Sequence, residues 1–176
     1  SVSIWSSIPS GLTATTPLFN IPIGSSIYSW KVVWLSSQII SFGARYRTVR
    51  VDEVSTAINT NQWNHIAITF DGLDPNDVAS WKLFINGANI TNLTSGGHLG
   101  TNGTAKTYIA RDQANYGKVK IDELSLYDIK LTESNVTDIY NGGEPTDLTS
   151  LSPLAWYRMG DNGSYKSLQW LIPSNE

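Results

Sequence analysis

The sequence predicts an all-β fold of antiparallel strands, and three observations carry this prediction. Short runs within 63–70, 81–85 and 117–128 place apolar residues at every second position, which is the pattern of half-buried strands. Turn-forming residues separate the first two runs at 71–77, and Asn86-Gly87 tolerates the positive φ of a tight turn. The composition agrees, because 7 Trp and 8 Tyr with only 15% charged residues are typical of a turn-rich β protein.

Further strands are expected on either side of this central region. Runs at 2–6, 17–21, 27–35 and 108–112 read as strands, and 38–42 and 45–51 are expected to form a hairpin that turns at Gly43-Ala44. Both parities of 27–35 are largely apolar, so this strand is either covered on both faces or presents an exposed aromatic face. About twelve strands are expected in all.

One helix is expected, about two turns long, after the strand at 117–128. Thr132 is placed as its N-cap, and Glu133 stands in the first turn, where a carboxylate is favoured by the helix dipole. Apolar residues between 136 and 140 form one side, and Gly142-Gly143 ends the helix.

The three central runs also carry a resemblance to a known family. Their order is W-x-H-I-A-x-T-x-D-G from Trp63, W-K-L-F-I-N-G from Trp81, and G-K-V-K-I-D-E-L-S-L-Y-D from Gly117, followed by Leu131-Thr132. This order resembles the laminin-G-like branch of the concanavalin-A-like lectin/glucanase superfamily, over roughly residues 1–143. The resemblance implies a two-sheet antiparallel jelly-roll sandwich with 2–6 as a central strand and the short helix covering one end. It leaves function open, because this architecture hosts lectins, adhesion modules and glycosidases.

The residues after this region form a separate prediction. Residues 1–143 are expected to be the laminin-G-like sandwich, and 144–176 a connector followed by a returning strand. The run at 154–161 resembles the strand that opens such domains, but here it comes last. Either the chain is cut out of phase from an array of modules, or this strand pairs within the domain or with a neighbouring subunit. We favour a piece of a larger, modular protein.

Composition excludes several classes of function. The net charge of −3 is dispersed, so no basic stripe exists to bind a nucleic acid. The absence of Cys excludes disulfides, thiolate metal sites and a Cys nucleophile. No run of about 18 apolar residues is present, so membrane insertion is not expected.

An enzyme is the least favoured of the classes considered. Glucanases of the superfamily carry E-x-D-x-x-E on one strand, and this pattern is missing here. Asp122 and Glu123 are adjacent, which in a regular strand places their side chains on opposite faces. His65 and His98 are read as non-catalytic, because neither is accompanied by a nucleophile motif such as G-x-S-x-G.

Calcium is the metal that the resemblance implies. Relatives of this fold bind Ca²⁺ at one rim of the sandwich through Asp and Asn side chains, and oxygen ligands are the kind this chain offers in number. The candidate ligands are Asp71 and Asp74 in the loop at 71–77, and Asp112 after the strand at 108–112. No EF-hand spacing accompanies them.

Carbohydrate binding is the leading functional prediction. Sugar rings stack their C–H faces on Trp or Tyr, while their hydroxyls need polar partners. The candidate ligand-binding residues are Trp30, Trp34, Tyr46, Arg47, Asn115 and Tyr116. Trp5, Trp63 and Trp81 match family positions that are ordinarily structural, so they are excluded from the site.

The sequence therefore predicts a non-catalytic recognition or adhesion module in a larger extracellular or virion-surface protein. Its partner is expected to be a glycan or another surface ligand. The alternative is a purely structural module of a phage or virus particle or fibre, with contacts to copies of itself or to other virion or surface proteins.

Overall fold

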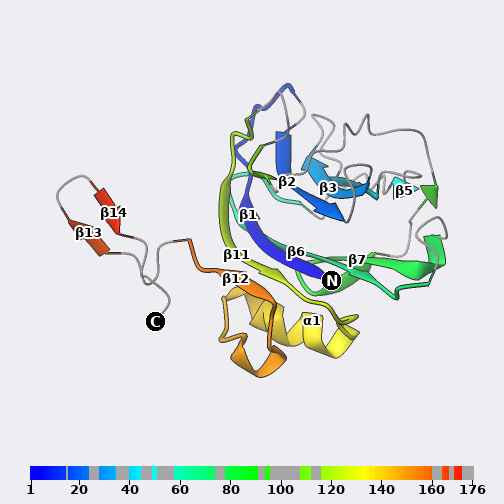
Figure 1. The fold of residues 1–176 in the computed structure, drawn as a ribbon. Coiled ribbons are helices and arrows are strands. Elements are labelled where there is room, and N and C mark those ends of the chain that lie inside the picture. The colour runs from blue at the N-terminus through cyan, green and yellow to red at the C-terminus, as the bar shows by residue number, and fades with distance from the viewer. Residues whose placement is uncertain are drawn as a thin grey trace.

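Two antiparallel sheets lie face to face, and a helix covers the outer face of the larger one (Figure 1). The computed structural model describes residues 1–14, 16–23, 28–34, 40–44, 49–50, 58–73, 78–90, 94–95, 108–111, 116–159, 164–166 and 169–171. The prediction of an all-β sandwich with one short α-helix is confirmed for this part of the chain.

The larger sheet has six strands. Their order across the sheet is β12 (Ala155–Tyr157), β11 (Lys120–Leu126), β1 (Val2–Ser7), β6 (Trp63–Phe70), β7 (Trp81–Ile85) and β8 (Ala88–Ile90). β1 therefore lies in the middle of the sheet, as the resemblance implied, and it pairs with β6 without interruption from Val2↔Ile68 to Ser7↔Trp63.

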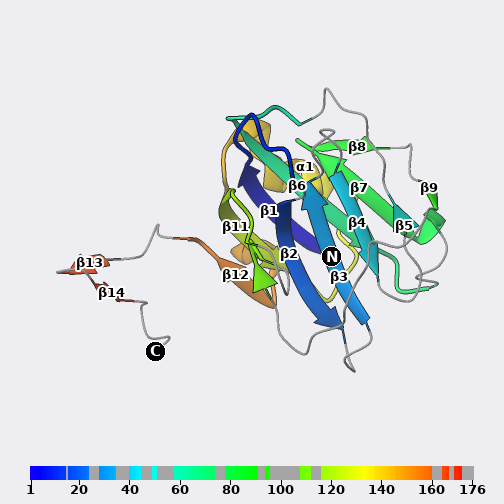
Figure 2. The same ribbon diagram turned by 90° about the horizontal axis from the view of Figure 1, so that it is seen from above.

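The smaller sheet has four strands, and Figure 2 shows from above that this sheet lies over the larger one. Their order is β10 (Tyr108–Ile109), β2 (Thr16–Ile23), β3 (Tyr28–Trp34) and β4 (Ile40–Ala44). Two short pairs belong to neither sheet: β5 (Val49–Arg50) with β9 (Thr94–Ser95), and β13 (Ser164–Lys166) with β14 (Gln169–Leu171).

The hairpin predicted for 38–51 is wrong. Gly43 and Ala44 do not form its turn, because they continue β4 and pair with Lys31 and Trp30 of β3. β5 pairs with β9 and not with β4. The physical reason is that β3 is long enough to pair with β4 as far as Ala44. A glycine within a strand weakens this pairing but does not prevent it.

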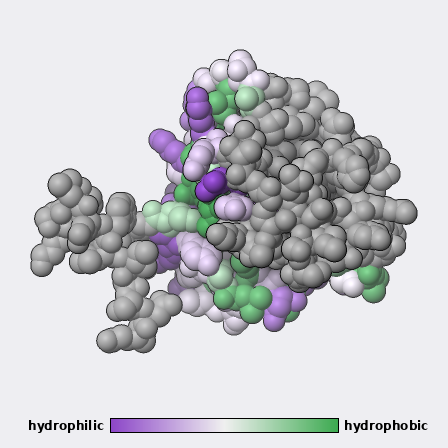
Figure 3. All heavy atoms as spheres, turned by 45° about the horizontal axis from the view of Figure 1, so that its top comes forward, coloured by the Kyte–Doolittle hydropathy of each residue, from purple (hydrophilic) through white to green (hydrophobic). Residues whose placement is uncertain are grey.

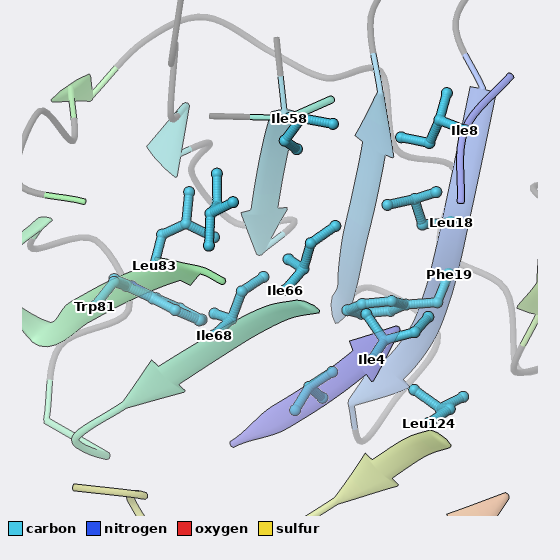
Figure 4. Packing of buried hydrophobic residues seen from close by; sticks show 12 residues of the cluster. Ile4, Ile8, Leu18, Phe19, Ile58, Ile66, Ile68, Trp81, Leu83 and Leu124 are labelled. Carbon is cyan, nitrogen blue, oxygen red and sulfur yellow. The ribbon is translucent and has the colours of Figure 1, made fainter. Parts of the chain in front are cut away.

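The space between the sheets holds the main hydrophobic core. Figure 4 shows Ile4 of the larger sheet beside Phe19 of β2, with Ile66, Ile68 and Trp81 continuing the same apolar layer. The period-two pattern explains this arrangement, since alternate residues of β1 and β6 point to one face. Leu18 and Phe19 are both fully buried in this core although they are adjacent, because a register irregularity interrupts β2 between Pro17 and Phe19.

A second core lies on the outer face of the six-stranded sheet, beneath α1 (Glu133–Tyr140). It consists of Ala67, Phe84, Tyr127, Leu131, Val136, Ile139 and Leu148. Thr132 caps the helix as predicted, and its side chain accepts a hydrogen bond from the Asn135 amide. Glu133 accepts hydrogen bonds from Lys82 Nζ at 2.7 Å and Asn89 Nδ2 at 2.9 Å, which fix the first turn over β7 and β8.

Short 3₁₀ segments complete the described elements: η1 (Val78–Ser80), η2 (Asn141–Gly143) and η3 (Thr149–Leu151). After η3, β12 returns to the sandwich and pairs with β11 from Leu126↔Ala155 to Leu124↔Tyr157. The boundary at 143/144 stays a prediction. No helix in the described part of the chain is both long and apolar enough to cross a membrane.

Candidate functional site

The predicted ligand-binding residues divide into three groups. Trp30 and Trp34 lie in β3, where Trp30 pairs with Ile21 and Ala44, and Trp34 pairs with Thr16 and Ile40. The predictions for Tyr46, Arg47 and Asn115 fall outside the described residues. Tyr116 is described, and 73% of its surface is exposed.

Tyr116 belongs to a cluster with Tyr108 and Arg111, which we call the tyrosine–arginine cluster. The Arg111 guanidinium carbon lies 4.7 Å from the centre of the Tyr116 ring and 5.3 Å from the centre of the Tyr108 ring. An antiparallel bridge between Arg111 and Tyr116 holds their backbones side by side. Contacts of this kind contribute roughly 0.5–2 kcal/mol each, the larger value applying where water is excluded.

The backbone around this cluster explains its position at the edge of the smaller sheet. Tyr108 and Ile109 pair with Asn20 and Phe19 of β2. The Ala110 amide donates to the Leu18 carbonyl at 2.8 Å, and Ala110 has a φ of 52° that turns the chain away from the strand. The chain thus leaves β10 next to the buried core, which anchors one side of the cluster.

Gly117 anchors the other side. Its amide donates to the Ala110 carbonyl at 2.6 Å. A Cβ at this position would lie 2.4 Å from the Pro17 carbonyl oxygen and 3.1 Å from that of Ala110. Only glycine allows this close approach of three backbone segments. Residue 117 therefore fixes where Tyr116 emerges from the sheet.

Arg111 carries a charge that its described neighbours do not neutralise. Its Nε atom is buried and has no hydrogen-bond partner. The ion pairs among the described residues join Lys82 to Glu133, Lys130 to Asp71 and Arg158 to Glu123, and none involves Arg111. The cluster thus combines an exposed aromatic ring with a guanidinium cation whose N–H donors are not all used by described acceptors.

The predicted calcium ligands are only partly described. Asp71 Oδ1 accepts a hydrogen bond from the Leu73 amide at 2.9 Å, and Oδ2 lies 4.0 Å from Lys130 Nζ. Asp71 therefore stabilises the turn after β6. Asp74 and Asp112 lie outside the described residues, and among those described no group of three His, Cys, Asp or Glu is placed to hold a metal ion. The calcium site stays a prediction.

The expectation that Asp122 and Glu123 occupy opposite faces relied on regular alternation, and that premise is wrong. A bulge interrupts the pairing of β1 with β11, and Glu123 has a φ of 50°. Ile121 and Leu124 both contact the inter-sheet core although they are three residues apart, which shows the break.

Glu123 has an identifiable structural role at this bulge. Its carboxylate accepts hydrogen bonds from the Trp156 indole and, at 3.4 Å, from Arg158 Nε. Burial raises the pKa of the Glu123 carboxyl, and the two donors partly oppose that rise. Through these hydrogen bonds the Glu123 side chain links β11 to Trp156 in β12 and to Arg158, which follows β12.

His65 is fully buried on the outer face of the larger sheet. Its ring lies 5.3 Å from Trp5 and 6.0 Å from Tyr140, and its Nε2 is 2.8 Å from Ser3 Oγ. Nδ1 has no described partner. Burial lowers the pKa of His65 to about 4. The ring is sealed from solvent, and the second histidine, His98, lies outside the described residues.

The three tryptophans that are excluded from the predicted binding site differ in how much of their surface is exposed. Trp5 and Trp81 are each 3% exposed, whereas Trp63 is 46% exposed at the start of β6. Figure 3 shows apolar side chains lying among polar ones on the described part of the face that it presents. An exposed Trp63 is thus a surface aromatic that the family motif did not distinguish from a core residue.

Comparison with solved structures shows a shared fold. A Trypanosoma rangeli sialidase in complex with sialic acid superposes with a TM-score of 0.51 and 12% identity, covering 79% of this chain and 22% of the sialidase. The binding domain of botulinum neurotoxin serotype D gives a TM-score of 0.50 and 17% identity, covering 80% of this chain and 35% of the binding-domain chain. The chain thus spans well under half of either protein.

A search of curated protein sequences gives no match. The resemblance inferred from the three central motifs is confirmed by a family model. That model describes the concanavalin A-like lectin/glucanases superfamily, in its laminin G form, and matches residues 1–137 of the 176, so the chain belongs to this family.

Proposed function

We propose that this chain is a non-catalytic module that binds carbohydrate through the tyrosine–arginine cluster. The observation that carries the proposal is the exposed Tyr116 ring held against the Arg111 guanidinium. A flat aromatic surface beside a fixed donor group is what a sugar ring needs, because its C–H face stacks and its hydroxyls accept hydrogen bonds.

The contacts within the cluster support this role. Binding costs less free energy when the contacting side chains are already ordered. Arg111 lies against two tyrosine rings, and Gly117 fixes the chain next to Tyr116 through the contact with Ala110. A ligand would therefore meet a largely preformed surface.

The proposal is for binding rather than catalysis. Retaining glycosidases need two carboxyl groups about 5 Å apart in an open groove. Glu123, the buried carboxylate of β11, is instead engaged by Trp156 and Arg158. We place the module in a larger extracellular or virion-surface protein, as the Ser-, Thr- and Asn-rich sequence without Cys favours.

Replacing Tyr116 by Ala is expected to weaken glycan binding by about tenfold or more, because the stacking surface is lost. The measurement is a glycan-array screen of the purified chain, followed by titration of the best ligand. Leu73→Ala is the matched control, since Leu73 is an apolar side chain that is 81% exposed, and it should bind as the wild type does.

The same screen is run with millimolar Ca²⁺ and with a chelator. Loss of binding on chelation would support the predicted calcium site at Asp71, Asp74 and Asp112. If the wild type binds no sugar under either condition, the lectin role is contradicted. The assembly role would then be favoured. The first contact surface to examine would be formed by Tyr157 in the edge strand β12 and by Leu154 and Met159 next to it, all of which are exposed.

A further inference from the structure

We infer that the tyrosine–arginine cluster selects acidic sugars, and specifically sugars that carry a carboxylate. This inference rests on the proposed function, because it names the ligand class of the same site. It starts from Arg111, whose guanidinium has aromatic contacts on two sides and no acidic partner among the described residues.

The donors of Arg111 are only partly used. The Arg111 Nε atom is buried and has no hydrogen-bond partner. The two terminal nitrogens are not among the described atoms that are both buried and without a partner. No ion pair or hydrogen bond joins these terminal nitrogens to a described acceptor, so they can donate to an acceptor that a ligand supplies. The two Tyr rings contact the guanidinium through their faces, with its carbon 5.3 Å from the centre of the Tyr108 ring and 4.7 Å from the centre of the Tyr116 ring.

Partial burial strengthens the attraction for an anion. A cation that has lost part of its water and has a buried donor without an acceptor is under-compensated, and a carboxylate at its open edge supplies the missing charge. After Arg111, the next charged residue that the structure describes is also positive. It is Lys118, which is exposed and stands two residues after Tyr116. Arg111 and Lys118 thus bring two described positive charges to this edge of the smaller sheet, although Asp112 directly follows Arg111 in the sequence and the chain as a whole carries a net charge of −3.

A carboxylate fits this cation better than other anionic groups do. Its two oxygens lie in one plane and match the parallel donors of a guanidinium, whereas a sulfate is tetrahedral and spreads its charge over more oxygens. A hexuronic acid joins such a carboxylate to a ring with a C–H face. The ring would stack on Tyr116 while the carboxylate meets the terminal nitrogens of Arg111.

The test compares ligands that differ only at the acidic group. The full chain is titrated by calorimetry with a hexuronic acid oligosaccharide, with its methyl ester and with a sulfated neutral oligosaccharide of the same length. The wild type should bind the acid about tenfold more tightly than the ester, and more tightly than the sulfated sugar. Arg111→Gln should lose this preference, so that the acid and the ester bind with similar affinity, and both should bind more weakly than the acid binds to the wild type. Arg111→Lys should keep only part of the preference, because it retains the charge without the planar donors.

A second measurement does not depend on any variant folding correctly. Binding of the acid by the wild type should weaken as the salt concentration rises, while binding of the ester should not change. Equal affinity for acid and ester would overturn the inference and leave the proposed function standing, and tighter binding of the sulfated sugar would overturn the choice of carboxylate. Absence of binding to all three sugars and to the glycan array would overturn the proposed function itself.

Discussion

Replacing Phe19 by Ala is expected to lower the free energy of unfolding by about 3–5 kcal/mol, the largest effect of a single substitution that we predict. Phe19 is fully buried in the core between the sheets, and its backbone joins β2 to both β3 and β10. The substitution removes most of an aromatic side chain, and the rigid sandwich around it closes the cavity only in part.

The measurement is urea unfolding of the variant and the wild type, followed by fluorescence of the tryptophans. Leu73→Ala is the control for deleting an apolar side chain, and its effect should stay within about 0.5 kcal/mol because Leu73 is exposed. A loss of less than about 1 kcal/mol for Phe19→Ala would contradict the position of this residue at the centre of the core.

Acidification through the titration range of His65 is expected to destabilise the fold by on the order of 3 kcal/mol. Burial lowers the pKa of His65 from 6.5 to about 4. Between these values the unfolded chain binds a proton that the folded chain does not, so the loss of stability caused by His65 is absent above pH 6.5 and grows as the pH drops toward 4. The charged ring would lie against Trp5 and Tyr140 with no described carboxylate to pair with it.

Other groups titrate in the same range, so the comparison needs a variant. The raised pKa of Glu123 acts in the opposite direction, because its buried carboxyl takes up a proton more readily in the folded state. His65→Gln keeps a polar group near Ser3 and removes the titration. The loss of stability between pH 6.5 and about 4 should be smaller in this variant than in the wild type by the amount given above. Equal losses in the two proteins would contradict the account of His65.

Prediction from the sequence was most successful where burial of one sheet face requires an apolar residue at every second position. Ile66, Ile68 and Leu83 lie in the core because a sheet with one covered face repeats every two residues, and Thr132 caps α1 because few residue types satisfy a free helix amide. Prediction failed at Glu123 and at Gly43-Ala44. A bulge in the pairing of β1 with β11 determines the backbone at Glu123, and pairing with β3 extends β4 through Gly43-Ala44. Both features depend on residues distant in the chain.

The candidate site was predicted only in part for the same reason. The sequence predicts Tyr116 as a ligand-binding residue, but it places Tyr108 and Arg111 only in a strand. Their contact with Tyr116 follows from the turn at Ala110 and from the space that Gly117 leaves beside Pro17. A glycine directly after an aromatic residue is a weak signal in sequence and becomes informative only when the opposing backbone is known.

The most direct test of carbohydrate recognition by the tyrosine–arginine cluster is a two-dimensional ¹H–¹⁵N NMR titration of the wild-type chain with the best glycan from the array. The structure predicts that the largest shift changes fall on Tyr108, Arg111, Tyr116 and Gly117, and that exposed residues of α1 such as Ser134 do not shift. Shift changes that instead gather around the exposed Trp63, with the tyrosine–arginine cluster unperturbed, would contradict this assignment of the site.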